Sequence, residues 1–182
     1  MALQAELEAI AAAAAVLAGP GESLSGVIAT EPEPGLRVYL CAFDGPARTW
    51  IALDAEGRAI GERGLVRRAV SIAAMCELAE EAAGGGKLEE LRAQLVSLRL
   101  TERPEGIEEA EEAALELERT IGVPPRVATP ARLNEIGAAT RRLEDALGEG
   151  PGSPFVEAMK HGTAVAAELE REVLSGYKGV LS

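Results

Sequence analysis

The stretch that decides the fold is GLRVYLCAFDGPARTWIALDAEGRAI, residues 35–60. Apolar residues fill positions 38–43, Asp44-Gly45-Pro46 interrupts the run, and a second apolar run occupies 49–53, which is the pattern of a β-hairpin. Residues 58–60 follow another turn and predict a third arm. Both faces of these strands are apolar, so the sheet needs cover on two sides, from helices or from a partner subunit.

Helices are predicted on both sides of this stretch in the sequence. An apolar seam predicts a first helix over 2–18, and 62–83 is the most apolar helical segment, which we expect to cover the hairpin. Between them, 26–30 predicts a short strand, whereas the proline-rich 31–35 predicts an exposed connection that does not pair. The hairpin aromatics expected to pack against the covering helix are Tyr39, Phe43 and Trp50.

The second half of the chain is predicted to be almost entirely helical. Apolar seams run over 87–100 and 105–121, and Thr129-Pro130 and Ser153-Pro154 each combine an N-cap hydroxyl with a first-turn proline. Residues 123–127 are expected to be a stiff linker. The fold class is therefore α+β: an N-terminal helix, a three- or four-stranded antiparallel β-meander covered by an apolar helix, and a mostly helical C-terminal half.

The three glycines at 84–86 mark the predicted boundary between two parts of the chain. Residues 1–86 would form the α+β part and 87–182 a helical bundle, either as separate domains or packed into one. The short apolar tail, 176–181, is expected to dock on a neighbour.

The charge and the cysteines limit the partners and the location. The formal net charge of −12 opposes binding to nucleic acid or to an anionic membrane surface. Cys41 and Cys76 lie in apolar segments without CxxC spacing, which favours two buried thiols in a cytoplasmic protein. The first residues lack the basic region of a signal peptide. Only three of the 18 basic residues are lysine, which is typical of a GC-rich bacterial genome.

One segment resembles a known catalytic motif. Residues 76–83, CELAEEAA, are similar to the end of the Nudix box, in which clustered helix carboxylates bind magnesium beside a diphosphate. The resemblance implies Glu77, Glu80 and Glu81 as magnesium ligands. It covers about eight residues. The chain departs from the family pattern at four positions, where that pattern has Arg, Gly, Glu and Gly in place of Cys76, Ala83, Arg68 and Glu62.

The same carboxylates also resemble the ExxE motif of the all-helical MazG-like nucleotide pyrophosphohydrolases. Glu77 and Glu80 match the first half of that pattern, in which carboxylates one helical turn apart hold magnesium. Glu108 with Glu111, or Glu109 with Glu112, would have to replace the ExxD pair that the family places in the second half. The alternative is that 102–118 is a solvated acidic helix face.

The remaining candidate groups are few. His161 is the only histidine, so a histidine-based catalytic or metal site depends on it, and it stands one helical turn from Glu157. A further hypothesis is a local basic patch near the hairpin turns and the start of the covering helix, formed by Arg48, Arg58, Arg67 and Arg68.

The sequence therefore leads to two functional hypotheses from different classes. The first is a non-enzymatic cytoplasmic bacterial protein that forms a homo-oligomer or binds a protein partner through its apolar seams and hairpin face, without a cofactor. The alternative is a magnesium-dependent hydrolase of a nucleotide or another diphosphate, with Glu77, Glu80 and Glu81 as metal ligands.

Overall fold

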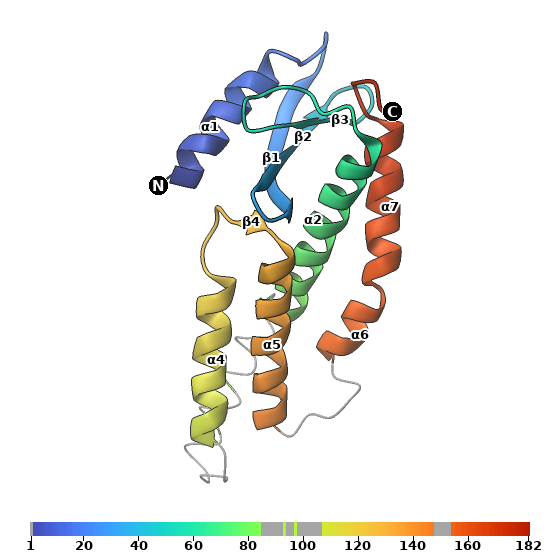
Figure 1. The fold of residues 1–182 in the computed structure, drawn as a ribbon. Coiled ribbons are helices and arrows are strands. Elements are labelled where there is room, and N and C mark those ends of the chain that lie inside the picture. The colour runs from blue at the N-terminus through green and yellow to red at the C-terminus, as the bar shows by residue number, and fades with distance from the viewer. Residues whose placement is uncertain (1, 85–92, 94–96, 98–106, 148–153) are drawn as a thin grey trace. The chain divides into compact units, whose positions relative to one another are not determined.

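The computed structural model describes residues 2–84, 93, 97, 107–147 and 154–182. It has the predicted α+β fold, with an N-terminal helix, a four-stranded sheet and a mostly helical C-terminal half (Figure 1). The elements, in chain order, are α1 (Ala2–Ala15), β1 (Ser23–Glu33), β2 (Leu36–Asp44), β3 (Thr49–Leu53), α2 (Arg63–Gly84), α4 (Ile107–Ile121), β4 (Val127–Ala128), α5 (Pro130–Ala146), α6 (Pro154–Lys160) and α7 (Gly162–Ser175).

The sheet has the strand order β3-β2-β1-β4. β1, β2 and β3 form the predicted antiparallel meander, and β4 adds a short parallel pair opposite Ala29 and Thr30 of β1. The linker predicted at 123–127 therefore ends in a strand that sequence patterning did not reveal. The predicted third arm at 58–60 is reduced to one bridge, between Leu53 and Ala59.

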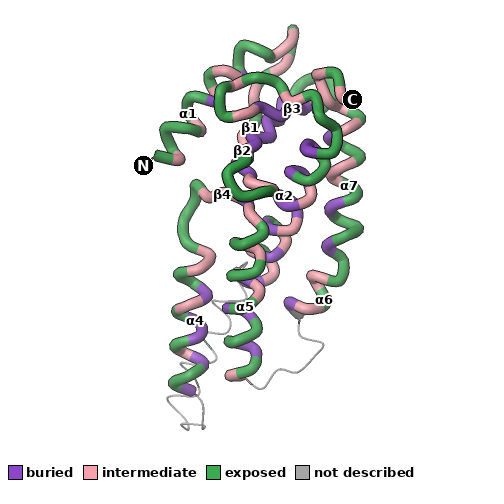
Figure 2. Tube along the Cα trace, in the orientation of Figure 1, coloured by how far each residue is buried: buried purple, intermediate pink, exposed green. Residues whose placement is uncertain are grey.

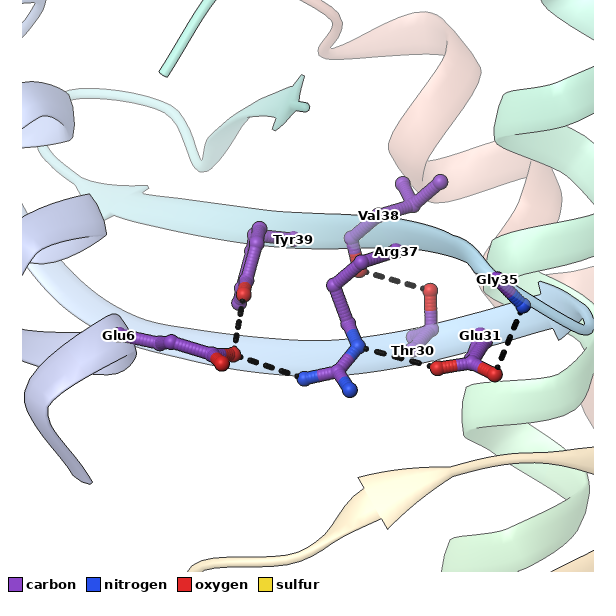
Figure 3. Close-up of polar contacts among 7 residues, drawn as sticks. All are labelled: Glu6, Thr30, Glu31, Gly35, Arg37, Val38 and Tyr39. Atoms are coloured by element: carbon purple, nitrogen blue, oxygen red, sulfur yellow. Dashed lines mark hydrogen bonds and ion pairs between the residues drawn. The ribbon is translucent and has the colours of Figure 1, made fainter. Parts of the chain in front are cut away.

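The proline-rich segment 31–35 was wrongly predicted not to pair. β1 continues to Glu33, which lies opposite Leu36, after a register shift between Thr30 and Glu33. The shift accommodates Pro32, which has no N–H to donate to a regular ladder. The Thr30 hydroxyl donates a 2.8 Å hydrogen bond to the Val38 carbonyl, so the two strands remain joined next to the irregular residues (Figure 3).

The sheet is covered on both faces, as its two apolar faces predict. On one face, called the α1 face, Ile10 and Ala14 of α1 pack against the sheet, whose buried residues there are Ala29, Tyr39, Cys41, Phe43, Ile51 and Leu53. On the other, called the α2 face, residues of α2 and α7 cover the buried side chains Val38, Leu40, Ala42, Trp50 and Ala52. Only Trp50 of the three hairpin aromatics therefore faces α2. The prediction for Tyr39 and Phe43 was wrong, because period-two alternation places them on the α1 face.

The structure forms two compact units that interleave along the chain. Unit 1 holds 1–74, 124–130 and 164–182, and unit 2 holds 75–123 and 131–163. Both units therefore draw on both sides of the expected boundary at residue 86, which itself lies outside the described residues. Unit 1 contains the sheet, α1 and the tail.

Unit 2 is built from helices. Its core joins the last turns of α2 to α4, α5 and α6 through a mainly alanine and leucine interior, which suits closely approaching helices. Along α4 and α5, buried and exposed residues alternate with the helical period (Figure 2). The helix predicted to begin at Ser153-Pro154 is divided at His161 into α6 and α7. Of the helix predicted over 87–100, the structure describes only residues 93 and 97, which are both helical.

Candidate functional site

One cavity of unit 1 lies between α1 and β2. It has a volume of about 400 Å³ and is lined by Glu6, Ala9, Ile10, Arg37, Tyr39 and Ala55. Helical spacing places Glu6, Ala9 and Ile10 on the side of α1 that meets the sheet. Arg37 and Tyr39 are two residues apart on β2 and therefore point to the same face. The cavity combines an apolar wall with three polar side chains.

These polar side chains form one chain of hydrogen bonds (Figure 3). Oε2 of Glu6 accepts from the Tyr39 hydroxyl at 2.8 Å and from Nη1 of Arg37 at 2.9 Å. Nε of Arg37 donates to Oε2 of Glu31 at 3.3 Å, and the Gly35 amide donates to Oε1 of Glu31 at 3.1 Å. The guanidinium thus bridges a carboxylate of α1 to a carboxylate of β1.

The protonation state of Tyr39 limits the chemistry open to the hydrogen-bonded side chains of Glu6, Arg37 and Tyr39. Burial, and then the hydrogen bond to the Glu6 carboxylate, raise the pKa of the Tyr39 hydroxyl above its ordinary value of 10.0. The hydroxyl is therefore a hydrogen-bond donor at neutral pH and not a base or a nucleophile. Because Arg37 is already shared between two carboxylates, the arrangement is suited to fixing α1 on the sheet.

The three predicted magnesium ligands lie near the end of α2 in unit 2. Glu77 and Glu81 are exposed, whereas Glu80 is half-buried and forms an ion pair with Arg132 of α5 at 2.9 Å. Within 2–84, 107–147, 154–182 and the two isolated described positions, no group of three or more His, Cys, Asp or Glu side chains is placed to hold a metal ion. Glu80 instead contributes to a helix-joining contact.

Arg132 is the centre of that contact. Its Nε donates to Glu80 at 3.0 Å, Nη1 donates to the Thr120 carbonyl at 3.0 Å, and Nη2 donates to the Ile121 carbonyl at 2.7 Å. The last carbonyls of a helix have no partner within the helix, so a cation there both caps and complements the helix dipole. Arg132 therefore ties α2 and the end of α4 to α5. Nothing in the sequence around Arg132 indicated this role.

The second predicted carboxylate set lies on α4. Glu109 and Glu112 line a cavity of about 740 Å³ in unit 2, opposite Arg141, Arg142 and Asp145 of α5. Arg142 forms ion pairs with Glu112, at 4.0 Å, and with Glu116. The α4 carboxylates that line this cavity therefore face arginines across it.

The four arginines of the predicted basic patch are each paired with a carboxylate. Arg48 pairs with Asp44, Arg58 with Asp54 and Glu56, Arg67 with Glu170, and Arg68 with Glu33. Each of the four guanidiniums thus has a carboxylate within 4.0 Å, so their positive charge is compensated inside unit 1.

His161 lies in the turn between α6 and α7 and is exposed. Its predicted neighbour Glu157 accepts a 2.7 Å hydrogen bond from Nζ of Lys160. That bond, the nearby lysine charge and, to a smaller extent, His161 lower the pKa of Glu157. Lys160 is thus the direct partner of this carboxylate.

The tail, residues 176–182, covers the outer edge of β3 and so docks on its own chain. The Trp50 amide donates to the Gly176 carbonyl at 2.9 Å, and the Lys178 amide donates to the Trp50 carbonyl at 2.8 Å. The Tyr177 hydroxyl donates to the Ile60 carbonyl at 2.6 Å and accepts from the Ala52 amide at 3.2 Å. The tail therefore satisfies main-chain groups that an edge strand would otherwise expose.

Lys178 and Glu22 lock the tail in place. Nζ of Lys178 lies 2.5 Å from Oε1 of Glu22, 2.7 Å from the Leu17 carbonyl and 4.3 Å from the centre of the Phe43 ring. Hydrogen bonds from Lys178, then from Thr49 and the Gly19 amide, lower the pKa of Glu22 to about 2. The Glu22 carboxylate is therefore ionised across the physiological pH range.

The opposite edge of the sheet is the outer side of β1, and much less of it is covered. In the part of the chain that the structure describes, only Val127 and Ala128 pair with the outer side of β1, opposite Ala29 and Thr30. The preceding residues of β1, 23–28, are half-buried or exposed, with Ile28 at 37% exposure. We call the outer side of residues 23–28 the open edge. Hydrophobic patterning could not reveal it, because whether an edge is covered depends on distant segments.

None of the described helices is long and apolar enough to cross a membrane. Comparison with protein-family models, with curated proteins and with solved structures gives no match to this chain.

Proposed function

We propose that this chain is a non-enzymatic protein-interaction module that binds a β-strand at the open edge of β1. The observation that carries the proposal is the contrast between the two edges of the sheet. The outer edge of β3 is covered by the chain's own tail, whereas β4 covers only two residues of β1. Natural sheets commonly protect their edges with charges, prolines or covering segments. Residues 23–28, SLSGVI, contain no charge and no proline.

Strand addition explains what the open edge would recognise. Main-chain N–H and C=O groups supply the affinity, and side chains that alternate along the strand supply the specificity. On the α2 face, Ile28 is the exposed apolar residue of this edge. A partner strand would therefore gain main-chain hydrogen bonds and an apolar contact with Ile28.

We also propose a cytoplasmic location in a bacterium. Cys41 and Cys76 are both buried, and neither forms a disulfide. Burial raises the pKa of the Cys41 thiol to about 12, which keeps it protonated and unreactive. Two buried thiols support a reducing compartment, and the low proportion of lysine among the basic residues supports a GC-rich bacterial genome.

A strand-binding assay tests the proposed function directly. The probe is a short fluorescein-labelled peptide of alternating Thr and Val, and the readout is its fluorescence polarisation with increasing protein. Ile28→Lys places a charge on the open edge, and Leu36→Lys is the matched control because Leu36 is also an aliphatic residue of 37% exposure but lies on β2. The peptide should bind the wild type and Leu36→Lys but not Ile28→Lys. Equal binding to all three proteins, or to none, would contradict the proposal.

A further inference from the structure

The open edge exists because β4 stops after two residues. Parallel pairing of Val127 with Ala29 would, if continued backwards, place Pro125 opposite Val27 and Pro124 opposite Gly26. Prolines have no N–H to donate, so this segment cannot continue the ladder. The sequence that precedes β4 therefore leaves the first part of β1 available to another strand.

The charges at the ends of the open edge are compensated within the chain. Glu22, before Ser23, is paired with Lys178, and Glu31, beyond Thr30, is paired with Arg37. Neither Glu22 nor Glu31 is therefore left to attract a basic partner strand, and the open edge itself is uncharged. The strand that fits best is uncharged and rich in residues that favour β-structure.

We propose that the docking strand is β1 of a second copy of this chain, in a step that rests on the proposed function. The copies would pair antiparallel across a two-fold axis perpendicular to the sheet, because only this arrangement uses the same edge of both copies in a closed dimer. The two α2 faces then lie on the same side of a continuous sheet. Each copy supplies the uncharged strand that the other requires.

The boundaries of the open edge fit this arrangement. Residues 23–28 of one copy, paired in reverse order with 23–28 of the other, fill the edge without displacing β4 of either copy. A chain of net charge −12 repels a second copy, and an approach through an uncharged strand keeps charged side chains out of the contact. The register shift between Leu24 and Gly26 makes the pairing short and irregular, so the dimer should be weak and depend on concentration.

Sedimentation equilibrium of the purified full chain tests the dimer. The weight-average mass of the wild type and of Leu36→Lys should rise with concentration towards twice the monomer mass. Ile28→Lys should remain monomeric. Gly26→Lys is a second edge variant, since a Cβ at Gly26 meets no atom within 4 Å, and it should also remain monomeric. Circular dichroism melts confirm that the variants fold.

Hydrogen exchange on the same samples identifies the surface. In the wild type, amide protection within 23–28 should increase as concentration rises, and this increase should be lost in Ile28→Lys. A wild type that stays monomeric overturns the dimer, and so does a dimer that protects other residues instead. The two proposals can be distinguished. If the wild type is monomeric but binds the Thr/Val peptide through Ile28, only the dimer is contradicted. If it is monomeric and binds no peptide, both the dimer and the proposed function are contradicted.

Discussion

Arg132 shows how much one side chain contributes to unit 2. Its guanidinium donates hydrogen bonds to Glu80 and to two carbonyls at the end of α4, and its side chain is only 15% exposed. Removing it leaves these acceptors without their cation, so Arg132→Ala should lower the free energy of unfolding by about 2 kcal/mol. Urea denaturation measures this value. Arg141→Ala, at an exposed position of the same helix, is the control and should change it by less than about 0.5 kcal/mol. Equal effects would contradict the role of Arg132.

The two tyrosines predict how stability depends on alkaline pH. Burial is the main cause that raises the pKa of both Tyr39 and Tyr177 above 10.0. The folded protein therefore holds these protons more tightly than the unfolded chain does. The corresponding stability is fully present below pH 10 and is lost as pH rises through the higher folded-state values.

Melting temperature against pH checks this expectation. It should fall above about pH 10, and tyrosinate absorbance should appear only in step with unfolding. Because Tyr39 and Tyr177 are the only tyrosines, Tyr39→Phe should retain just the Tyr177 contribution. Ionisation of both tyrosines near pH 10 in the folded state would be inconsistent with their buried hydroxyls.

At the scale of elements, the docked tail depends on a close approach at Gly176. A Cβ there would lie 2.7 Å from the Arg48 carbonyl oxygen, which belongs to the backbone and cannot easily move. Gly176→Ala should therefore displace the tail from β3, lower the melting temperature and increase amide exchange at Trp50 and Lys178. Gly137→Ala is the opposite control, because a Cβ in the middle of α5 meets nothing within 4 Å and should stabilise the helix by about 0.5–1 kcal/mol.

The α2 carboxylates allow a direct test of the alternative hydrolase hypothesis. Glu77→Gln combined with Glu81→Gln removes two candidate ligands and leaves the pair between Glu80 and Arg132 intact. Because Glu80 already has a cationic partner, magnesium chloride should shift the melting temperature of the wild type and of this variant equally. A magnesium-dependent stabilisation of the wild type alone would favour the hydrolase.

Local patterning predicted the elements whose own sequence specifies them. Alternation at 38–43 and 49–53 identified β2 and β3, and Pro130 after Thr129 marked the start of α5. β4 was missed because two residues after Pro124-Pro125 carry no pattern. Its pairing depends on β1, which lies about a hundred residues earlier.

The candidate site was less predictable for the same physical reason. The pairing of Glu80 with Arg132, of Arg37 with Glu6, and of Lys178 with Glu22 each joins residues more than 30 positions apart. Residue type and spacing suggested metal ligands and a basic patch, because those patterns consider only near neighbours. In the fold, most of these charges compensate one another.

At the scale of the whole molecule, the order of segments along the chain predicts how it folds. Unit 1 requires β4, part of α7 and the tail, all of which come after residue 123. A fragment of residues 1–86 lacks the α7 side chains that pack beside α2 on one face of the sheet. It also lacks the tail that covers the edge of β3. It should therefore expose apolar surface and an unprotected strand edge.

Expression of the two halves tests this consequence of interleaving. The fragment 1–86 alone should show no cooperative thermal transition and should aggregate, whereas co-expression with 87–182 should restore a soluble complex with a cooperative melt. Lys178→Ala in the second fragment should weaken this complex, because Lys178 joins the tail to Glu22 and to the Leu17 carbonyl of the first fragment. If 1–86 alone melts cooperatively at a temperature close to that of the full chain, the first half is an independent domain that folds without the later segments.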